Sequence, residues 1–392
     1  SFANCSSVTP FPALGSFGES MYAHPAKTMQ TVAVAVSGGV DSLCALLLLR
    51  RAGHKVLALH GRFLPEGPED APLGLYRACA ALDVPLHVVD LRQGFAREVL
   101  TPFAAAYAAG RTPNPCARCN RAIKFGALLD AALALGADRL ATGHYARLVP
   151  GPDRSELPLL ATAQDAAKDQ SYFLSLVPRQ RLARAQFPLA GQDKTTTRAL
   201  VAAAGLTVPL PGESQDICFV PTPEKGAGNE AYRPFLESRW RAAGLDAPEP
   251  GPVLLADAQG GLREIGRHRG LWRYTEGQRK GLGIAYSEPL YVLRKDRAAN
   301  ALVVGPRHLL GMRWCRTARA NLLLPPEFWP EAVLVRLRYR QRPASAQVRV
   351  AADGGLHISL AEPLFPSAPG QVAAVYDPAG RVLAAGVVTL MG

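Results

Sequence analysis

Residues 37–42 are of the types that can hold a phosphate group. They read Ser-Gly-Gly-Val-Asp-Ser, after an apolar stretch of β type at 32–36 and before a leucine-rich stretch of helical type. Two adjacent glycines permit a tight turn that brings backbone N–H groups close to an anion, and the following helix adds the partial positive charge of its N-terminus. Ser37 and Ser42 add two hydroxyl groups. The pattern predicts a phosphate-binding loop, but not a Walker loop, because no Gly-Lys-Ser/Thr follows the glycines.

Three cysteines form a second group of residues that could take part in chemistry. Cys116 and Cys119 stand in a C-x-x-C within the proline-containing segment 111–120, and Cys218 lies far along the chain. We expect a helix to begin near Ala122, which would put the C-x-x-C at a helix N-terminus, close to Arg118, Arg121 and Lys124. Because both influences lower a thiol pKa, the sequence predicts that at least one of these thiols exists largely as thiolate.

The residues alone leave the role of these thiols open, since thiolates are both nucleophiles and ligands of soft metals. A redox pair and half of a structural zinc site use the same C-x-x-C spacing, although no second C-x-x-C is present to complete a zinc site. The seven cysteines are irregularly spaced, which argues against the disulfide framework of a secreted protein. We expect the four without partner spacing to be core or incidental thiols, namely Cys5, Cys44, Cys79 and Cys315.

The elements that must position the phosphate loop alternate in type. Runs of β type at 31–36, 56–59, 86–89 and 139–141 are separated by helical patterns. This alternation predicts βαβ units, and therefore an α/β domain with a parallel sheet and helices on both faces. Ligands of such sheets bind at the carboxyl ends of the strands, and the glycine loop follows the first strand at that end.

The last third of the chain has a different character. After a Pro/Gly-rich boundary at 247–252, turn residues and alternating apolar residues replace the helical periodicity. This pattern predicts a small β domain of barrel-like form. Four arginines alternate with other residues there, so on a strand they would share one face and could follow a phosphate backbone or protect a sheet edge: Arg336, Arg338, Arg340 and Arg342.

Composition places the chain among soluble globular proteins. It has 392 residues, 48% hydrophobic and 19% charged, which excludes a disordered chain and allows two or three domains. The formal net charge of +12 indicates an anionic partner such as nucleic acid. No apolar run approaches the length of a membrane span, and residues 1–28 lack a secretory signal pattern. We expect a cytoplasmic protein with no membrane partner and with 1–28 as a loose N-terminal extension.

Several motifs, in order along the chain, resemble those of the tRNA-specific 2-thiouridylases. The loop at 37–42 is similar to the SGGxDS loop of ATP pyrophosphatases, which split ATP between its α and β phosphates. The resemblance implies a parallel-sheet ATP-pyrophosphatase (PP-loop) domain at 29–208, a central domain at 209–275 and a C-terminal β-barrel domain at 276–392. The other matching motifs are GRTPNP at 110–115, CN at 119–120, IKF at 123–125, ATGHY at 141–145, KDQSYF at 168–173, SQDICF at 214–219 and GQRKGLG at 277–283.

The resemblance implies an enzyme that thiolates the wobble uridine of tRNA to 2-thiouridine. ATP first adenylates the C2 oxygen, sulfur then replaces the adenylate, and AMP and pyrophosphate are released. The implied partners are tRNA and a sulfur donor, either a persulfide carrier or sulfide, and Asp41 is expected to help hold the Mg²⁺ that accompanies ATP. The implied ATP contacts are Ala35, Val36, Ser37, Gly38, Gly39, Val40, Asp41, Ser42, Gly61 and Gly143. The implied tRNA contacts are Asn114, Pro115, Cys116, His144, Lys168, Asp169, Gln170, Arg338, Tyr339 and Gln371.

This chain departs from the family pattern at Cys116, where many members carry Asp. The family pattern makes Cys119 the nucleophile and Cys218 the carrier of a persulfide. With a third thiol at Cys116, the set suits a 4Fe-4S cluster with one iron open to sulfide, and we favour this cluster over a cluster-free persulfide relay. A second departure is His60-Gly61 in place of a Phe-Met pair whose Met backbone meets adenine, so Gly61 is the expected adenine contact.

Two other classes of function remain open. Another PP-loop enzyme, such as an ATP-dependent amidotransferase or ligase, would need neither the three cysteines nor a basic β domain. A non-catalytic iron–sulfur protein that binds tRNA would not release pyrophosphate in response to tRNA.

Overall fold

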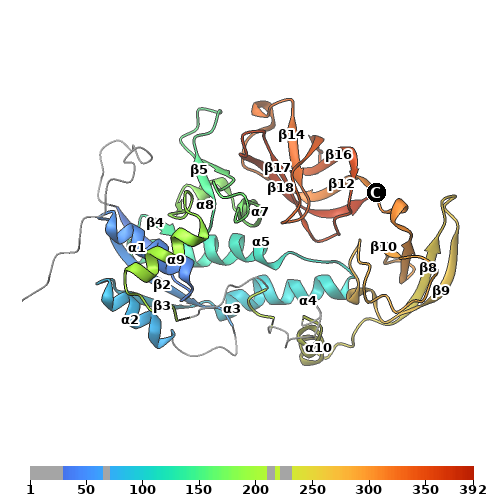
Figure 1. Ribbon diagram of the computed structural model, residues 1–392, viewed down its shortest axis with the longest axis horizontal. Coiled ribbons are helices and arrows are strands. Elements are labelled where there is room, and N and C mark those ends of the chain that lie inside the picture. The colour runs from blue at the N-terminus through green and yellow to red at the C-terminus, as the bar shows by residue number, and fades with distance from the viewer. Residues whose placement is uncertain (1–29, 65–70, 210–216, 221–231) are drawn as a thin grey trace, which may run out of the picture.

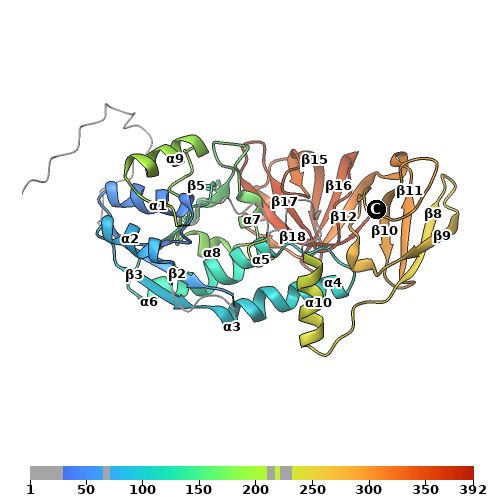
Figure 2. The same cartoon turned by 60° about the horizontal axis from the view of Figure 1, so that its bottom comes forward.

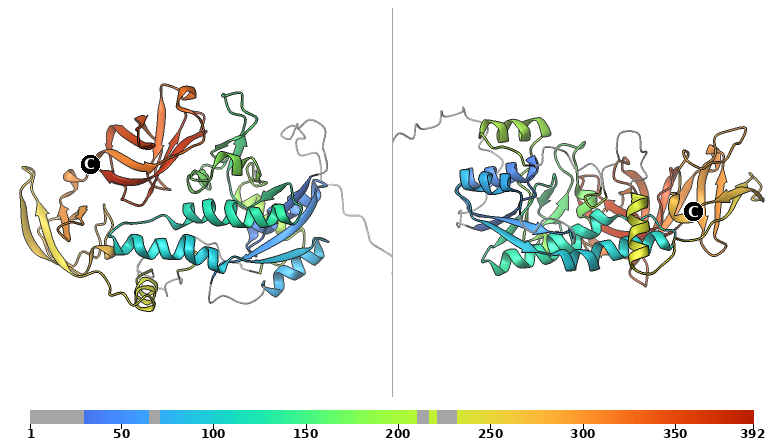
Figure 3. Two further views of the ribbon diagram at one scale, coloured as in Figure 1. Left: turned by 180° about the vertical axis from the view of Figure 1, so that it is seen from behind. Right: turned by 90° about the horizontal axis from the view of Figure 1, so that it is seen from below.

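The computed structural model describes residues 30–64, 71–209, 217–220 and 232–392. The expected extension at 1–28 and Cys5 therefore lie outside the described residues. Figure 1 shows an α/β unit at one end, a β-barrel over the middle of the molecule and a second small sheet at the other end. Two long helical segments run side by side beneath the barrel and join the ends, as the reverse view in Figure 3 also shows.

A five-stranded parallel sheet carries the glycine loop. Its strand order is β3 (Leu86–Asp90), β2 (Lys55–Arg62), β1 (Thr31–Ala35), β4 (Arg139–Ala141) and β7 (Ala185–Gln186). The four predicted strands are confirmed as β1 to β4, whereas the two-residue β7 is too short to leave a sequence pattern. The sheet is apolar on both faces because helices cover both of them, as predicted for a parallel sheet.

The two faces of this sheet have separate cores. Val32 and Val34 of β1 face α1 (Val40–Arg51), α2 (Leu73–Ala81) and α9 (Lys194–Ala203). Ala33, the residue between them, points the other way, toward η2 (Asn120–Leu128), α6 (Leu129–Ala134) and α8 (Arg179–Leu182). Alternate residues of one strand therefore anchor both helical layers, which fixes the end of β1 where the loop begins.

Two helical segments run from the α/β unit beneath the barrel, and the second of them carries the C-x-x-C. The first combines α3 (Arg92–Phe95), η1 (Ala96–Leu100) and α4 (Thr101–Ala108), and the second combines α5 (Pro115–Cys119) with η2 and α6. The prediction of a helix start near Ala122 is wrong, since α5 begins at Pro115. Asn114 caps this helix, its Oδ1 accepting a hydrogen bond from the Ala117 backbone N–H at 3.0 Å. Proline at the first position has no N–H that would need an acceptor. The C-x-x-C thus lies inside the first helical turns.

Smaller elements complete the α/β unit and its border. A hairpin forms from β5 (Arg147–Val149) and β6 (Leu159–Ala161), followed by the short helix α7 (Ser171–Leu174). Helix α10 (Tyr232–Ala242) packs against α4 through Trp240, whose indole N–H donates to the Ala104 carbonyl at 3.3 Å. None of the helices in the described ranges is both long and apolar enough to cross a membrane.

A four-stranded sheet follows α10. Its order is β10 (Tyr291–Asp296), β11 (Ala301–Gly305), β8 (Gly251–Ala256) and β9 (Leu262–His268). The boundary expected at 275/276 falls between β9 and β10 of this one sheet. A division after Gly305 keeps each sheet whole.

The C-terminal unit is a β-barrel, as predicted, and Figure 2 shows it in side view. Six strands close the barrel. Neighbouring strands around it are β12 (Met312–Arg319), β16 (Gly355–Leu364), β15 (Ala344–Val350), β14 (Val333–Arg336), β17 (Val372–Tyr376) and β18 (Val382–Met391). The pairing of β12 with β18 closes the ring, and the short strand β13 (Asn321–Leu322) adds to β18.

The prediction of one strand face with four arginines is wrong. Strand β14 ends at Arg336, and the residues after it turn, with the Gln341 N–H donating to the Arg338 carbonyl at 3.2 Å. Arg336 is drawn inward by the Asp169 carboxylate at 2.6 Å, and Arg338 by the Glu276 carbonyl at 2.8 Å. Contacts with other units therefore override the alternation that the sequence pattern indicated.

Candidate active site

The glycine loop is a tight turn between β1 and α1. Gly38 has a φ of 88°, a left-handed conformation that favours glycine. The Ser42 hydroxyl donates to the Gly39 carbonyl at 2.8 Å and accepts from the Ser37 backbone N–H at 3.2 Å, so it braces the turn from within. Helix α1 has no side-chain cap, which leaves its first backbone N–H groups available to an anion.

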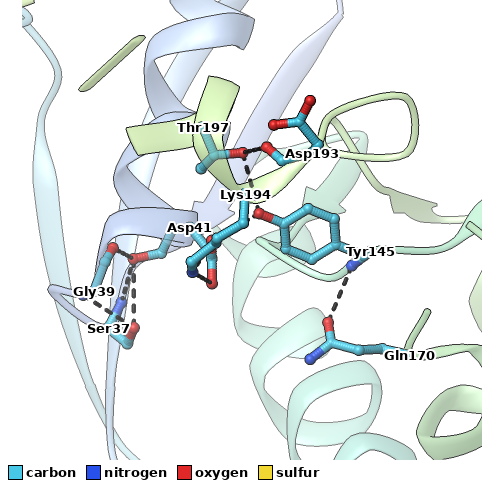
Figure 4. A network of polar contacts seen from close by, with 9 residues as sticks. Ser37, Gly39, Asp41, Tyr145, Gln170, Asp193, Lys194 and Thr197 are labelled. Carbon is cyan, nitrogen blue, oxygen red and sulfur yellow. Dashed lines mark hydrogen bonds and ion pairs between the residues drawn. The ribbon is translucent and has the colours of Figure 1, made fainter. Parts of the chain in front are cut away.

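A network of polar side chains surrounds Asp41 at the start of α1 (Figure 4). Both Asp41 carboxylate oxygens accept from the Lys194 ammonium, at 2.7 and 2.8 Å. The Tyr145 hydroxyl donates to Asp41 Oδ1 at 2.9 Å and lies 3.1 Å from the Thr197 hydroxyl. Asp41 is thus oriented by groups from α9 and from the loop after β4, both far from it in sequence.

Gly143 is required by a close approach of two backbones. A Cβ atom there would lie 2.7 Å from the Asp41 carbonyl carbon and 2.9 Å from the Ser42 backbone nitrogen. Real Cβ atoms do not come so close to backbone, so only glycine lets the loop after β4 touch the start of α1. The structure therefore brings the predicted residue Gly143 against the phosphate loop.

Gly61 lies on β2, the neighbouring strand, beneath an aromatic ring. A Cβ atom at Gly61 would lie 2.7 Å from the Phe63 ring, so the ring covers this position directly. His60 Nδ1 is 2.9 Å from the Val36 carbonyl, and because a carbonyl only accepts, Nδ1 carries the hydrogen. The His60-Gly61 pair thus belongs to the same strand ends as the glycine loop.

The three candidate thiols are brought to one region. Cys119 shares an apolar cluster with Phe219, the residue after Cys218. The Phe219 ring packs edge-on against Phe103 and Phe95, with ring centroids 5.1 and 5.8 Å apart. Burial of this ring anchors the segment 217–220, so Cys218 is held beside the helix that carries the C-x-x-C, while its own side chain is exposed.

The predicted thiolate is wrong for the protein in this state. Burial raises the pKa of Cys116 to about 11 and that of Cys119 to about 12, although Lys124 opposes the shift. Crowding by protein atoms also raises the pKa of Cys218, even though its side chain stays exposed. Arg118, which was expected to be a cation near the thiols, is paired with Glu98 at 3.5 Å. Because desolvation raises the pKa by more than the charge of Lys124 lowers it, the thiols are protonated at neutral pH.

Lys124 and His144 connect the thiols to the glycine loop. The positive charge of Lys124 lowers the pKa of all three thiols, and its Nζ is 3.4 Å from His144 Nε2. Because an ammonium only donates, Nε2 accepts, and Nδ1–H then donates to the Thr142 hydroxyl at 2.7 Å. His144 adjoins Gly143, so contacts run from Lys124 to Asp41, and the charge of Lys124 acts on the thiols.

We expect His144 to make stability depend on pH. Burial and the nearby Lys124 hold its pKa well below the ordinary value of 6.5, so the folded protein keeps it neutral while the unfolded chain protonates it. Stability is therefore complete above pH 6.5 and falls as the pH drops, by up to about 1.4 kcal/mol per pH unit for this group. The free energy of unfolding, measured with denaturant at several pH values between 7.5 and 5.5, should fall less steeply with decreasing pH in His144→Gln than in the wild type.

Burial also lowers the pKa of His268, so this residue adds to the loss of stability at low pH. Part of the pH dependence of stability therefore remains in His144→Gln. His308→Gln is the matched control because His308 is exposed on η4 (Arg307–Leu309). Equal slopes in the wild type and in His144→Gln would contradict the prediction.

The thiol set does not fit the expected 4Fe-4S cluster. Among the residues that the structure describes, no three Cys, His, Asp or Glu side chains stand close enough together to hold a metal ion. No step of the reaction is therefore routed through a cluster.

Most of the residues expected to meet tRNA also make contacts within the protein. Several support the structure: Asn114 caps α5, Pro115 is its buried first residue, and the Gln170 side chain accepts from the Tyr145 backbone N–H at 3.0 Å. Asp169 is buried and accepts a hydrogen bond from the Ser171 hydroxyl at 2.9 Å. Its ion pair with Arg336 at 2.6 Å joins the α/β unit to the barrel. Lys168 and Cys116 are half-buried.

Both β units hold the loop that leads into α5. Gln371 of the barrel donates to the Thr112 carbonyl at 2.9 Å, and Lys295 of the four-stranded sheet donates to the Thr112 hydroxyl at 3.3 Å. Lys295 and Glu276 form a buried ion pair at 3.4 Å, and Arg338 donates to the Glu276 carbonyl. Tyr339 stacks on Phe173 with centroids 4.4 Å apart. The expected contacts at Arg338, Tyr339 and Gln371 therefore lie where three units meet.

Sequence reasoning missed three residues of this site. Lys194 lies 153 positions from Asp41 and follows no recognised motif. Lys124 was noted only as a nearby cation and as part of the IKF motif, and Phe219 only as part of a motif. Neither the ring partners of Phe219 nor the burial of the thiols can be derived from spacing. A hydrophobic residue directly after an isolated cysteine was the available signal for Phe219.

A parallel sheet with a Ser-Gly-Gly-x-Asp-Ser loop at its first strand end, followed by two β units, defines a PP-loop nucleotide-binding protein. Family models agree with this division of the chain. A model described as a tRNA methyl transferase HUP domain matches residues 30–222, and one described as a tRNA methyl transferase PRC-barrel domain matches 247–306. A third, described as an aminomethyltransferase β-barrel domain, matches 312–388.

The chain belongs to the family of tRNA-specific 2-thiouridylases. It is 52% identical over 367 residues to the tRNA-specific 2-thiouridylase MnmA of Oleidesulfovibrio alaskensis, which covers 91% of this chain and 98% of the relative. It is 50% identical to that of Nitratidesulfovibrio vulgaris strain DP4, with the same coverage. A solved 4-thiouridine synthetase bound to RNA and ATP is 17% identical, with a TM-score of 0.34 over 55% of this chain and 51% of that one. The family assignment rests on the sequence relatives.

Proposed function

We propose that this protein converts the wobble uridine of tRNA to 2-thiouridine in an ATP-dependent reaction with an adenylated intermediate. The observation that carries the proposal is the group of residues between the phosphate loop and the thiols. Gly143 abuts Asp41, and its neighbour His144 binds Lys124, whose charge acts on Cys116, Cys119 and Cys218. A site that activates an oxygen with ATP and then replaces it with sulfur needs these two parts side by side.

In the first step the uridine C2 oxygen attacks the α-phosphorus of ATP and displaces pyrophosphate. The glycine loop and the start of α1 present backbone N–H groups, which stabilise the charge that develops on the leaving pyrophosphate. The Asp41 carboxylate is an oxygen ligand of the kind that Mg²⁺ prefers, so it would hold the ion that neutralises the phosphates of bound ATP. The step turns a poor leaving group at C2 into AMP.

In the second step a persulfide on Cys218 supplies the sulfur. Its terminal sulfur attacks C2 and expels AMP, and the Cys119 thiolate then attacks the Cys218 sulfur, which breaks the S–S bond and leaves the sulfur on the uridine. The products are 2-thiouridine and a Cys119–Cys218 disulfide, which an external dithiol reduces. Exposure of Cys218 suits loading by an external sulfur carrier, whereas Cys119 lies buried beside it. Lys124 supports formation of the Cys119 thiolate.

The direct test supplies unmodified tRNA, ATP, Mg²⁺, a persulfide donor and a dithiol, and measures 2-thiouridine by mass spectrometry of digested tRNA. We expect pyrophosphate release to depend on tRNA. Release without tRNA, in the presence of ammonia, would instead favour an amidotransferase or ligase. Absence of any release would favour a binding protein.

Anaerobic reconstitution separates the two sulfur routes. After incubation with iron and sulfide, the bound iron is counted and the thiolation rate is compared with that of protein treated with a chelator. We expect equal activity in the iron-free protein. Activity confined to protein with a full complement of iron would restore the cluster hypothesis.

A further inference from the structure

The connection between α4 and α5 is held by polar contacts. It spans residues 109–114 and lies beneath the barrel, beside the four-stranded sheet (Figure 1). None of these six residues, all of which the structure describes, belongs to an apolar core cluster, so apolar packing does not fix their course. Pro113 and Pro115 restrict the torsion angles on both sides of Asn114, the cap of α5. A displacement of Thr112 is therefore passed on to the start of α5.

Thr112 is the residue of this connection that both β units contact. Its N–H donates to the Pro369 carbonyl at 2.8 Å and its carbonyl accepts from Gln371 at 2.9 Å, both in the barrel unit. Its hydroxyl accepts from the Lys295 ammonium of β10 at 3.3 Å and lies 3.4 Å from the Thr275 hydroxyl. Every polar group of Thr112 thus has a partner outside the α/β unit, and the partner from β10 is charged.

The Lys295 ammonium is itself held in place. It donates to the Tyr274 carbonyl at 3.0 Å and lies 3.4 Å from the Glu276 carboxylate, and the Lys295 and Glu276 side chains are 1% and 2% exposed. The Glu276 carbonyl in turn accepts from Arg338 at 2.8 Å. Tyr274, Glu276 and Thr112 match the three N–H donors of an ammonium, so the position of Lys295 is defined from three sides.

Stability does not account for a buried ion pair at this place. Burial raises the pKa of Glu276 and lowers the pKa of Lys295, so desolvation opposes both charges. Their separation of 3.4 Å is longer than the about 2.8 Å of a strong charge-assisted hydrogen bond. Apolar side chains of similar volume in place of such a pair often leave a protein equally or more stable. A role in placing Thr112 explains why charge is present here.

We propose that Lys295 is a positioning residue for sulfur transfer. Its ammonium fixes Thr112, and through the two prolines it holds α5 so that the Cys119 thiol is correctly placed for the persulfide on Cys218. The proposal rests on the proposed function for the reaction itself. Cys119 is the last residue of α5, so a shift of the start of this short helix moves its thiol.

The effect should be confined to the sulfur step. Adenylation uses the phosphate loop, whose bracing hydrogen bonds lie within residues 37–42. The Lys295 ammonium acts on the other side of the site, at the connection that precedes the C-x-x-C. A residue that served only folding would instead affect adenylation and sulfur transfer together.

The test is a single turnover of the whole protein, with Cys218 loaded from a persulfide donor beforehand and the enzyme in excess over tRNA. Pyrophosphate and 2-thiouridine are timed in the same reaction. The main variant is Lys295→Met/Glu276→Met, which removes both charges together and leaves no unpaired charge buried. We expect 2-thiouridine formation to slow by about 10- to 100-fold, the effect of a misplacement of about 1 Å, and pyrophosphate release to stay within about twofold. Formation of 2-thiouridine at the wild-type rate, or equal slowing of both products, would overturn the proposal.

Thr112→Val tests the same contact without altering the ion pair. Valine has the shape of threonine but lacks the hydroxyl that accepts from Lys295. We expect 2-thiouridine formation to slow by about 3- to 10-fold, the effect of one ordinary hydrogen bond. Thr112→Ser keeps the hydroxyl and should form 2-thiouridine at nearly the wild-type rate. A wild-type rate in Thr112→Val would contradict the role of this contact.

Asp296→Asn is the matched control. Asp296 follows Lys295 on β10 and pairs with the exposed Arg294 at 3.2 Å, so the change removes another ion pair of the same strand. We expect both products to form at the wild-type rates. The melting temperature of Lys295→Met/Glu276→Met should equal or exceed that of the wild type. A lower melting temperature with slower release of both products would assign the pair to stability and overturn the proposal.

Hydrogen exchange of the free protein separates this proposal from the proposed function. The Ala117 N–H is bonded to the Asn114 cap, so a displaced start of α5 should make this amide exchange faster in the double variant and not in Asp296→Asn. Faster exchange, together with a wild type that makes no 2-thiouridine, supports the positioning of α5 and rejects thiolation. Unchanged exchange at Ala117, together with an active wild type, does the reverse.

Discussion

Cys119→Ser and Cys218→Ser should each abolish tRNA thiolation, with rates at least about a thousandfold below that of the wild type, while pyrophosphate release from ATP and tRNA continues. A serine hydroxyl at either position can neither carry a persulfide nor break one. The phosphate loop at 37–42 keeps its own residues and hydrogen bonds in both variants. Measuring both products in one reaction separates the sulfur step from adenylation.

The matched control is Cys79→Ser. Cys79 is buried in α2, in a different apolar cluster from that of Cys119, so thiolation per folded molecule should remain at the wild-type rate. Its melting temperature measures what burial of a hydroxyl costs in this protein. A wild-type thiolation rate in Cys119→Ser or Cys218→Ser would remove the assignment of sulfur transfer to these residues.

Cys116 decides between the two sulfur routes in the same experiment. The persulfide relay uses only Cys119 and Cys218, so Cys116→Asp should keep substantial thiolation. A 4Fe-4S cluster would lose one of its three cysteine ligands. Complete inactivity of a folded Cys116→Asp variant would therefore count against the relay.

Gly143→Ala should reduce ATP-dependent adenylation by about a hundredfold or more. The added methyl group would lie 2.7 Å from the Asp41 carbonyl carbon, so the loop after β4 and the start of α1 must separate. A shift of about 1 Å in a catalytic arrangement is enough for losses of this size. Both pyrophosphate release and thiolation should fall together, which distinguishes this variant from the cysteine variants.

Gly94→Ala provides the comparison for this change. A Cβ atom at Gly94 in α3 would meet only the Ile123 side chain, at 3.9 Å, which is ordinary contact distance. Alanine in a helix is favoured over glycine, so we expect unchanged activity and equal or higher stability. Normal adenylation by Gly143→Ala would mean that the two backbones do not need to touch.

The sequence alone was sufficient for the phosphate loop, the strands β1 to β4 and the barrel-like C-terminal unit. These features depend on local properties, such as the freedom of Gly38 to adopt a positive φ and the apolar runs that parallel strands need. It also grouped the three cysteines, which the structure brings to one region, while their function stays a prediction.

Tertiary structure decided the state of those residues and their partners. The thiols are protonated because burial outweighs Lys124, and desolvation depends on atoms from distant segments. Arg336 turned inward because Asp169 meets it from another unit, although its spacing indicated a strand face. Phe219 and Lys194 reach the site across long sequence separations. Contacts of this kind follow from packing between elements, which local spacing does not encode.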